Sequence, residues 1–400
     1  MTYLTGKLKD ITIIRTGKLD SNAAVSNGVY PFFTCDPTTL QINEWAYDTE
    51  AVLLAGNNAS GNYTAKYYCG KFNAYQRVYI IESANLNILN VRYLCYALNQ
   101  QLQLLKVMSS GSTTKFLTLR MLHDLEIPLP NITVQRRIAD ILSAYDDLIE
   151  NNQKQIKLLE EAAQRLYREW FVELRFPGHE TTPVVDGVPE GWERVPMGSI
   201  VDYEIGGGWG EDEPTAKAEI AAYVIRGTDI YGITHGEMMN IPHRYHPASN
   251  LSSRKLQPGD IVFEVSGGSR TEGVAKTLLI TDTMLKSWDK PVMCASFCKL
   301  MRFPTQMVAQ YVFDMLQYMR SIGKTEEFEK KSASSIINYR WKDFLEQLDV
   351  LLPSTELLQH YAEVAGELYN AIVVCSRKIE AAKKARDRLL PKLMSGELEV

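Results

Sequence analysis

Amide, hydroxyl and lysine side chains gather in two stretches of the first third of the chain. Residues 56–66 read GNNASGNYTAK and residues 109–115 read SSGSTTK. Asparagine can form two hydrogen bonds with adenine, and lysine can contact guanine or phosphate, so this chemistry suits the reading of DNA better than catalysis. The candidate contacts here are Asn57, Asn58, Ser60, Asn62, Tyr63, Lys66, Lys71, Ser112, Thr113 and Lys115.

A second pair of stretches with the same character lies about 220 residues further on. Residues 266–276 read SGGSRTEGVAK and residues 330–335 read KKSASS. The matching place in the sequence favours a shared role, although each stretch taken alone also fits an ordinary surface turn. The candidate contacts are Ser266, Ser269, Arg270, Thr271, Lys276, Lys331 and Ser334. Tyr75 and Trp209 are also candidates for base contact, but a core role is favoured for both.

Motifs that carry catalysis are missing from the sequence. It contains no G-x-x-x-x-G-K-[ST] phosphate loop, and the glycines of residues 206–210 run into Glu211-Asp212-Glu213-Pro214 instead of opening a helix. No Asn/Asp-Pro-Pro-aromatic loop of an amino-methyltransferase is present. The six cysteines form no C-x-x-C pair, so we predict neither a metal site nor catalytic residues.

Composition places the chain among ordinary globular proteins of two or three domains. It has 400 residues, of which 45% are hydrophobic and 23% are charged. No apolar run approaches the roughly 20 residues of a membrane helix, and charges interrupt the N-terminus, so we expect a cytoplasmic protein. The net charge of −5 means that, if the chain binds DNA, a partner must supply much of the attraction to phosphate.

The fold class predicted from periodicity is α+β. Strand-like runs fall at residues 51–55, 76–81, 222–226, 260–265 and 277–281, and helical runs at 91–106 and 306–322. Two tandem globules of mixed sheet and helix are therefore expected, each followed by a long helix.

The long helices are the clearest part of an internal repeat with a spacing of about 223 residues. Apolar positions in both recur in alternating steps of four and three, as in a coiled-coil seam, interrupted by Asn152 and Arg386. We predict that the two helices pair as an antiparallel coiled coil; the alternative is that each packs only on its own globule. The pairing residues are Ile138, Leu142, Ile149, Asn152, Ile156, Leu159, Leu166, Leu368, Ile372, Ile379 and Leu389.

Five segments follow from these patterns. They are a first globule at residues 1–130, a long helix within 131–174, a linker rich in proline and glycine at 175–192, a second globule at 193–353 and a second long helix within 354–400. The start of the second helix stays open. Pro391 is expected to end or kink that helix near its C-terminus.

Several motifs together resemble the specificity subunits of type I restriction-modification systems. They are IPLP at residues 127–130 with QRRIA at 135–139, RLYREWF at 165–171, PEGWE at 189–193 and LLPKLMSGEL at 389–398. They occur in the family's order along the whole chain. One departure is that the second copy has His360-Tyr361 in place of the Arg136-Arg137 pair.

The resemblance implies a DNA-binding subunit without its own catalysis. Each globule would be a target-recognition domain for half of a bipartite, gapped DNA site, and the helices would dock two methyltransferase subunits, with restriction (motor-nuclease) subunits completing the complex. S-adenosylmethionine, ATP and magnesium would be used by those partners, for N6-methylation of adenine or cleavage, and not by this chain. Two alternatives remain: a coiled-coil scaffold whose globules bind protein, and a self-contained methyltransferase-nuclease, which would need a cofactor motif that the sequence lacks.

Overall fold

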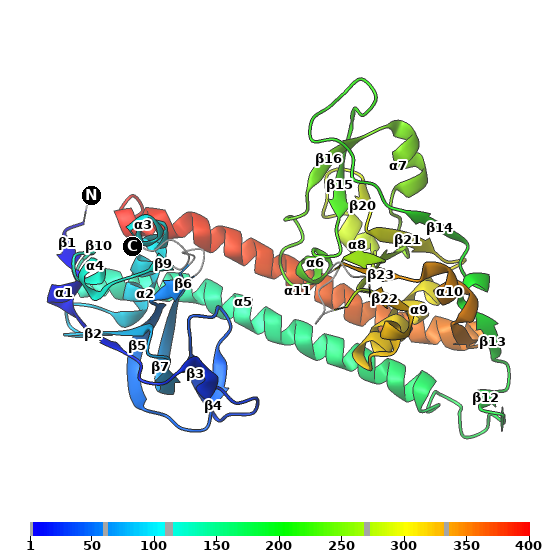
Figure 1. Cartoon of the computed structure of the whole chain (residues 1–400), viewed down its shortest axis with the longest axis horizontal. Coiled ribbons are helices and arrows are strands. Elements are labelled where there is room, and N and C mark those ends of the chain that lie inside the picture. Colours follow the sequence, from blue (N-terminus) through cyan, green and yellow to red (C-terminus); the bar gives the residue numbers. More distant parts are fainter. Residues whose placement is uncertain (1–2, 59–62, 109–114, 268–272, 332–335) are drawn as a thin grey trace. The chain divides into compact units, whose positions relative to one another are not determined.

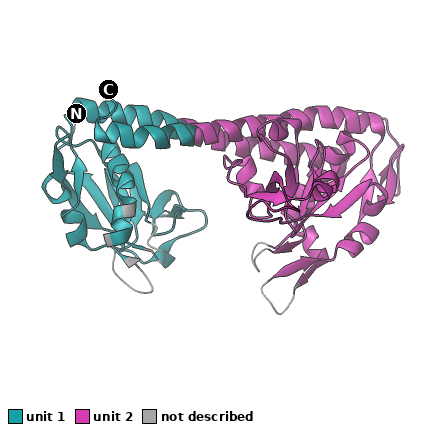
Figure 2. Cartoon of the chain, turned by 90° about the horizontal axis from the view of Figure 1, so that it is seen from above, with its two compact units in different colours: residues 1–147, 382–400 teal, residues 148–381 magenta. Residues whose placement is uncertain are grey.

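The computed structural model describes residues 3–58, 63–108, 115–267, 273–331 and 336–400. The chain divides into two compact units, shown in Figure 2: unit 1 comprises residues 1–147 and 382–400, and unit 2 comprises residues 148–381. Both units combine sheet and helix, so the predicted α+β class is confirmed. Each unit is described by itself, and the five-segment division of the sequence stays a prediction.

Unit 1 is built on a six-stranded sheet, labelled in Figure 1, in the order β2-β8-β5-β7-β3-β4. Neighbouring strands run antiparallel, except that β3 and β7 pair in parallel. The strands are β2 (Thr12–Thr16), β3 (Tyr30–Phe33), β4 (Leu40–Ile42), β5 (Tyr47–Ala55), β7 (Ala65–Ala74) and β8 (Val78–Ser83). Short elements surround this sheet: α1 (Leu8–Ile11), η1 (Ser21–Ala23), α2 (Val91–Gln100), α3 (Leu102–Met108), α4 (Leu119–His123), and the strand pairs β1 (Thr5–Lys7) with β10 (Glu126–Pro128) and β6 (Asn57–Asn58) with β9 (Lys115–Phe116).

The central strand β5 is buried on both faces. Val52 and Leu54 join the cluster that contains the residues of α2, while Ala51 and Leu53 join a second cluster with β8. This explains why residues 51–55 read as an unbroken apolar run and not as an alternating one. Helix α2 begins where the side chain of Asn90 accepts the backbone N–H of its third residue, which satisfies one of the unpaired donors of the first turn.

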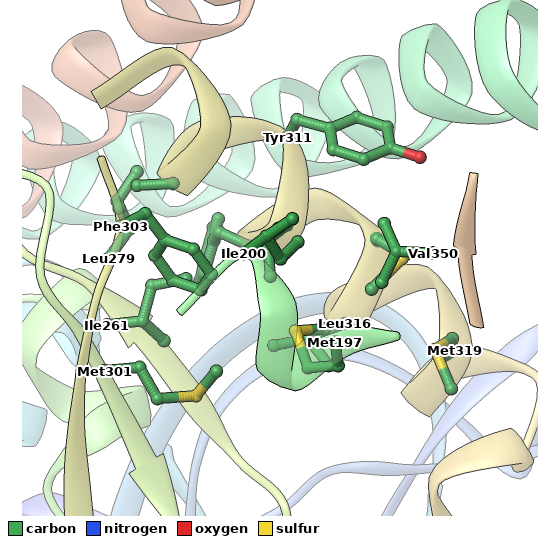
Figure 3. Close-up of a cluster of buried hydrophobic side chains, with 14 of the residues drawn as sticks. Met197, Ile200, Ile261, Leu279, Met301, Phe303, Tyr311, Leu316, Met319 and Val350 are labelled. Atoms are coloured by element: carbon green, nitrogen blue, oxygen red, sulfur yellow. The ribbon is translucent and has the colours of Figure 1, made fainter. Parts of the chain in front are cut away.

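Unit 2 contains a four-stranded sheet in the order β14-β21-β17-β19 and a three-stranded sheet in the order β16-β15-β20. Helix α9 covers the first sheet, and Figure 3 shows side chains of the strands and of α9 meeting in one buried cluster that includes Ile261, Met301 and Leu316. The main elements are β14 (Tyr203–Gly206), β15 (Ile220–Ile225), β16 (His243–His246), β17 (Ile261–Glu264), β19 (Thr277–Leu279), β20 (Val292–Cys294), β21 (Cys298–Arg302) and α9 (Gln306–Ser321). Smaller ones are η3 (Met197–Ser199), α6 (Ile230–Thr234), α7 (Ala248–Arg254), α8 (Asp282–Leu285), η4 (Lys324–Phe328), α10 (Trp341–Gln347), β13 (Glu193–Pro196) with β24 (Asp349–Leu352), and β18 (Ser266–Gly267) with β23 (Ile337–Tyr339) and β22 (Glu329–Lys331).

The two units repeat one topology. The order β2-β8-β5-β7 of unit 1 matches β14-β21-β17-β19 of unit 2, and the pairs β1-β10 and β6-β9 match β13-β24 and β18-β23. The strand pair β3-β4 matches β15-β16, and each pair joins its neighbour, β7 or β20, in parallel. Unit 2 adds α6, α7 and α8. The repeat inferred from the helices therefore extends through both globules.

The long helices begin 223 residues apart. Helix α5 spans Ile132–Tyr167 and continues as a π-helical turn at Arg168–Val172, and α11 spans Thr355–Ser395. Asn131 and Ser354 cap them, since each side chain accepts a backbone N–H three residues on, at 3.0 Å and 3.4 Å. The start of α11, which the sequence left open, is thereby placed at the position equivalent to the start of α5.

Within each unit, α5 and α11 lie side by side in opposite directions. In unit 2 the thiol of Cys375 lies 3.4 Å from Oε1 of Gln155, and the ring of Trp170 lies 5.4 Å from that of His360. In unit 1 Arg386 Nη1 lies 2.7 Å from Asp146 Oδ1. The contact partner in α11 moves towards its N-terminus as α5 advances, so the pairing is antiparallel, as the sequence predicts.

Helix α11 is also fixed to the globule of unit 2. The carboxylate of Asp314 on α9 is buried and accepts hydrogen bonds from Gln310 Nε2 at 2.8 Å and from two α11 tyrosines, Tyr361 at 2.7 Å and Tyr369 at 2.5 Å. Burial raises the pKa of Asp314 to about 6, against the lowering effect of these three donors. The alternative in which the helices pack on their own globules is therefore also part of the structure.

Pro391 does not end α11. The helix continues four residues further, to Ser395. Leu393 and Met394, one turn beyond the start of this segment, are fully buried in the core of unit 1. Burial of two such side chains contributes roughly 3–6 kcal/mol, which offsets the roughly 3 kcal/mol cost of a proline inside a helix.

Residues 175–192, expected as a linker, hold a short hairpin. Strands β11 (Val184–Val185) and β12 (Val188–Pro189) pair across Asp186 and Gly187, which both have positive φ, of 49° and 75°. Such a two-residue turn favours glycine at its second position. The flanking Phe176 and Trp192 are buried in the core cluster of unit 2.

Candidate nucleic-acid interface

The two candidate loops of each copy meet in a small sheet. In unit 1, Asn57 pairs with Phe116, and the carbonyl oxygen of Gly56 accepts the N–H of Leu117 at 2.8 Å. This pairing joins the stretch at residues 56–66 to the stretch at 109–115. The two stretches are 40 or more residues apart in sequence, yet they form one surface.

Unit 2 repeats this arrangement. Ser266 pairs with Asn338, and the carbonyl oxygen of Val265 accepts the N–H of Tyr339 at 2.8 Å. Here β23 also pairs with β22, which carries residues 329–331, so residues 266–276 and 330–335 are tied to the same strand. The equivalence of the loops inferred from sequence thus has a structural basis in both copies.

A third segment reaches the same place in each unit. It is the turn that precedes β8 or β21. The carbonyl oxygen of Arg77 accepts the N–H of Gly56 at 2.8 Å, and that of Phe297 accepts the N–H groups of Val265 and Ser266 at 2.9 and 3.2 Å. We call these three positions the corner: Asn57, Arg77 and Phe116 in unit 1, and Ser266, Phe297 and Asn338 in unit 2.

A glycine fixes the back of each turn. The N–H of Gly17 donates to Val78 and the N–H of Gly207 donates to Cys298, at 3.1 and 2.9 Å. At either glycine a Cβ atom would lie 2.2 Å from a backbone carbonyl oxygen of the turn. Only a residue without a side chain permits so close an approach.

In the corner of unit 1 the exposed side chain of Arg77 lies against an aromatic ring. Its guanidinium carbon is 5.4 Å from the centroid of the Phe116 ring, which is 36% exposed. A guanidinium held over an aromatic face loses less conformational entropy when it binds a partner. Asn57 adds an amide whose Oδ1 is buried and has no hydrogen-bond partner among the described residues.

The corner of unit 2 carries different chemistry. Phe297 is 58% exposed, and the hydroxyl of Ser266 donates to Oδ1 of the exposed Asn338 at 2.8 Å. Two residues beyond Gly207 comes Trp209, 38% exposed, with the guanidinium of Arg244 4.6 Å from its ring centroid. Trp209, expected in the core, is therefore partly at the surface.

The lysines and the tyrosine of the predicted set are placed unevenly. Lys66 Nζ donates to Thr39 Oγ1 at 3.1 Å, and burial lowers its pKa. Lys71 lies five residues further along β7, about 16 Å away at 3.3 Å per residue, with its Nζ 4.6 Å from the Trp45 ring centroid. Tyr63 is 4% exposed in the core of unit 1, so its ring serves packing and does not reach the surface.

Other predicted contacts are only partly described. Lys276 is half-buried, and its carbonyl oxygen accepts the N–H of Glu264 at 2.9 Å. For Asn58, Lys115 and Lys331 the described structure is that of the backbone alone. The remaining predicted contacts lie outside the described residues: Ser60, Asn62, Ser112, Thr113, Ser269, Arg270, Thr271 and Ser334.

Sequence reasoning missed four of the six corner residues: Arg77, Phe116, Phe297 and Asn338. None lies in a loop of conspicuous composition, and they meet only through strand pairing. The available signal was the glycine that follows the first strand-like run in each copy, Gly17 and Gly207, which marks a close approach of two backbone segments.

The predicted seam residues of the long helices are all removed from solvent at least in part. Ile138 and Leu142 join the core of unit 1, and the Cβ position of Gly236 lies 2.2 Å from the Ile379 side chain, so seam residues also face the globules. Buried members are Ile138, Leu142, Ile149, Asn152, Ile156, Ile372 and Ile379, and half-buried members are Leu159, Leu166, Leu368 and Leu389. Among the described residues, no helix has the length and apolar character needed to cross a membrane.

Comparison with known proteins agrees with the resemblance seen in the sequence. Residues 2–161 match the model of the type I restriction modification DNA specificity domain. A 163-residue stretch is 37% identical to the EcoDI specificity subunit of Escherichia coli, covering 41% of this chain and 35% of that protein. A 305-residue stretch is 27% identical to the MjaIX specificity subunit of Methanocaldococcus jannaschii, covering 74% and 66%. The chain thus spans about a third and about two thirds of these relatives' lengths.

One solved structure shares the fold over nearly the whole chain. It is the S subunit of a type I restriction-modification system from M. genitalium, with a TM-score of 0.66 and 14% identity, covering 98% of this chain and 96% of that one. At this identity the likeness establishes the architecture, and the chemistry of the corners has to be argued from the residues themselves.

Proposed function

Since residues 2–161 carry a type I restriction modification DNA specificity domain and the chain resembles type I specificity subunits, we propose that it recognises a bipartite, gapped DNA sequence for such a system. Each unit reads one half-site, half-site 1 by unit 1 and half-site 2 by unit 2. The observation that carries the proposal is the repeated corner, in which one backbone arrangement presents two different sets of side chains.

In this proposal the chain supplies recognition and its partners supply the chemistry. Two methyltransferase subunits dock on the paired helices, and restriction subunits join them. S-adenosylmethionine, ATP and magnesium act on those subunits, in keeping with the absence of their binding motifs from this sequence. With a net charge of −5, the chain alone binds DNA weakly, and the methyltransferase contributes much of the phosphate contact.

The direct test is methylome sequencing of a host that carries the methyltransferase partner with or without this chain. The expected result is a gapped motif with N6-methyladenine on both strands, present only with the chain. A matched control is the chain with Gly207→Ala, which disturbs only the corner of unit 2 and is expected to weaken the methylation of the motif.

Unchanged methylation in the host, together with no sequence-specific DNA binding by the reconstituted complex, would overturn the proposal. That pair of results would favour the scaffold alternative, in which the globules bind protein.

A further inference from the structure

The two corners differ most at the residue that their turns present to solvent. Arg77 and Phe297 occupy one backbone position, because each precedes the first residue of the equivalent strand and each carbonyl oxygen accepts an N–H from the start of the candidate loop. We propose that Arg77 and Phe297 are specificity-determining residues, Arg77 reading a guanine of half-site 1 and Phe297 the methyl group of a thymine of half-site 2. The proposal rests on the proposed function and deepens it.

The backbone of the turn is held rigidly at this position in both units. Besides the bond from the loop, the carbonyl oxygens of Tyr75 and Ala295, two residues earlier, accept the N–H groups of Val78 and Cys298 at 2.8 and 2.9 Å. In the same way, the N–H groups of Tyr75 and Ala295 donate to Phe33 and Ile225 at 2.9 and 2.8 Å. A side chain on such a support is placed before the ligand arrives, which reduces the entropy lost on binding.

Arg77 has the chemistry of a guanine reader. The fork of a guanidinium can donate to O6 and N7 of guanine together, which is the most frequent specific contact between proteins and DNA. No carboxylate is paired with Arg77 among the described residues; the recorded contact of its side chain is the Phe116 ring. Its donors are therefore available, and the neighbouring Asn57 provides the amide that suits an adjacent adenine.

Phe297 has no role in the core that would explain its side chain. More than half of its surface is exposed, although it stands between the buried residues Ala295 and Cys298. An exposed phenylalanine beside hydroxyl and amide groups is suited to an apolar contact with the C5-methyl group of thymine in the major groove. Ser266 and Asn338, hydrogen-bonded to each other at 2.8 Å, flank it with groups that can pair with base edges.

The first test is the methylome of hosts that carry Arg77→Ala or Phe297→Ala in the full complex. Arg77→Ala is expected to relax the motif at one G·C position of half-site 1 and to leave half-site 2 unchanged. Phe297→Ala is expected to relax one A·T position of half-site 2 only. The unchanged half-site shows in the same experiment that the variant complex is folded and assembled.

Matched controls exist in both units. Arg92 also lies with its guanidinium over a ring, 4.6 Å from the centroid of Tyr67, but on α2 and away from the corner. Ile322 is as exposed as Phe297, at 53%, and follows α9. Arg92→Ala and Ile322→Ala are expected to leave both half-sites unchanged.

The second test changes single atoms of the DNA. Binding of the wild-type complex to a duplex of the determined motif is compared with binding when 7-deazaguanine replaces the guanine, or uracil the thymine. Each replacement is expected to weaken binding by about 5- to 150-fold. The guanine replacement should have no further effect on the Arg77→Ala complex, nor the uracil replacement on the Phe297→Ala complex.

The outcomes separate this inference from the proposed function. Wild-type methylation of a gapped motif that neither variant alters, or a half-site 1 without a G·C pair and a half-site 2 without an A·T pair, would overturn the assignment and leave the proposed function standing. Loss of all motif-dependent methylation in the wild type would overturn both.

Discussion

Gly17 and Gly207 hold the same position in the two units, each with its N–H bonded to the first residue of the strand that leaves the corner turn. A Cβ atom on either would lie 2.2 Å from a carbonyl oxygen of that turn. The two corners therefore depend on one local device, which a single methyl group would disturb.

Gly207→Ala is expected to lower the free energy of unfolding of unit 2 by about 1–3 kcal/mol, because the added methyl forces backbone apart from backbone. Gly206→Ala is the matched control, since nothing lies within 4 Å of its Cβ position. Urea unfolding of both variants checks this. Equal stabilities of the two variants would contradict the close approach.

Asp314 gives a pH dependence whose sign follows from its raised pKa. Below about pH 3.8 the carboxyl is protonated in both states; as the pH rises to about 6, the unfolded chain ionises first, so this contribution to stability is lost. A shift of about 2 units corresponds to about 3 kcal/mol. The difference in unfolding free energy between wild type and Asp314→Asn should therefore fall by about that amount from pH 4 to pH 7.

The control for this titration is Asp282→Asn, whose carboxylate is 61% exposed and pairs with Lys286. Its profile should run parallel to that of the wild type. If the Asp314→Asn profile were parallel as well, the buried carboxylate would not titrate as described.

Arg386 and Asp146 join the long helices within unit 1, with side chains 29% and 39% exposed. Asp146 also accepts the phenol of Tyr96, so the pair is held in place on both sides. A double-mutant cycle of Arg386→Ala with Asp146→Ala should give a coupling free energy of about 1 kcal/mol. The exposed pair of Lys154 and Glu150 on α5 should give less than half of that, and equal couplings would count against a structural role for the Arg386 pair.

Patterns that repeat along one helix or strand were readable from the sequence. The steps of four and three predicted α5 and α11 because one face of each helix is buried throughout. The run at residues 51–55 predicted β5 because both faces of that strand are covered. Side chains that a short motif exposes, such as Ser266, were found for the same reason.

The corners as a whole could not be predicted, because their members meet through pairing between distant segments. Phe297 reaches Ser266 by a backbone bond across 31 positions, and Asn338 reaches it by strand pairing. Pro391 was misjudged because local propensity predicts a helix end there, whereas the burial of Leu393 and Met394 keeps the helix intact.

Deletion of one heptad from each long helix tests the expectation that the helices set the gap between half-sites. Seven residues span about 10 Å along a helix, which is the rise of about three base pairs. Methylome sequencing should show the gap shortened by up to about three base pairs, with both half-site sequences unchanged. A changed half-site sequence would contradict the separation of reading from spacing.

The central claim, that two units each read one half of a bipartite site, is tested most directly by binding of the reconstituted complex to four duplexes. One carries the determined motif, two have either half-site scrambled, and one has the gap lengthened by a base pair; affinities are measured at one salt concentration, since phosphate contacts depend strongly on salt. Binding should be tight only to the intact motif, and scrambling either half should weaken it to the level of unrelated DNA. Full affinity for a duplex that retains a single half-site would contradict the account.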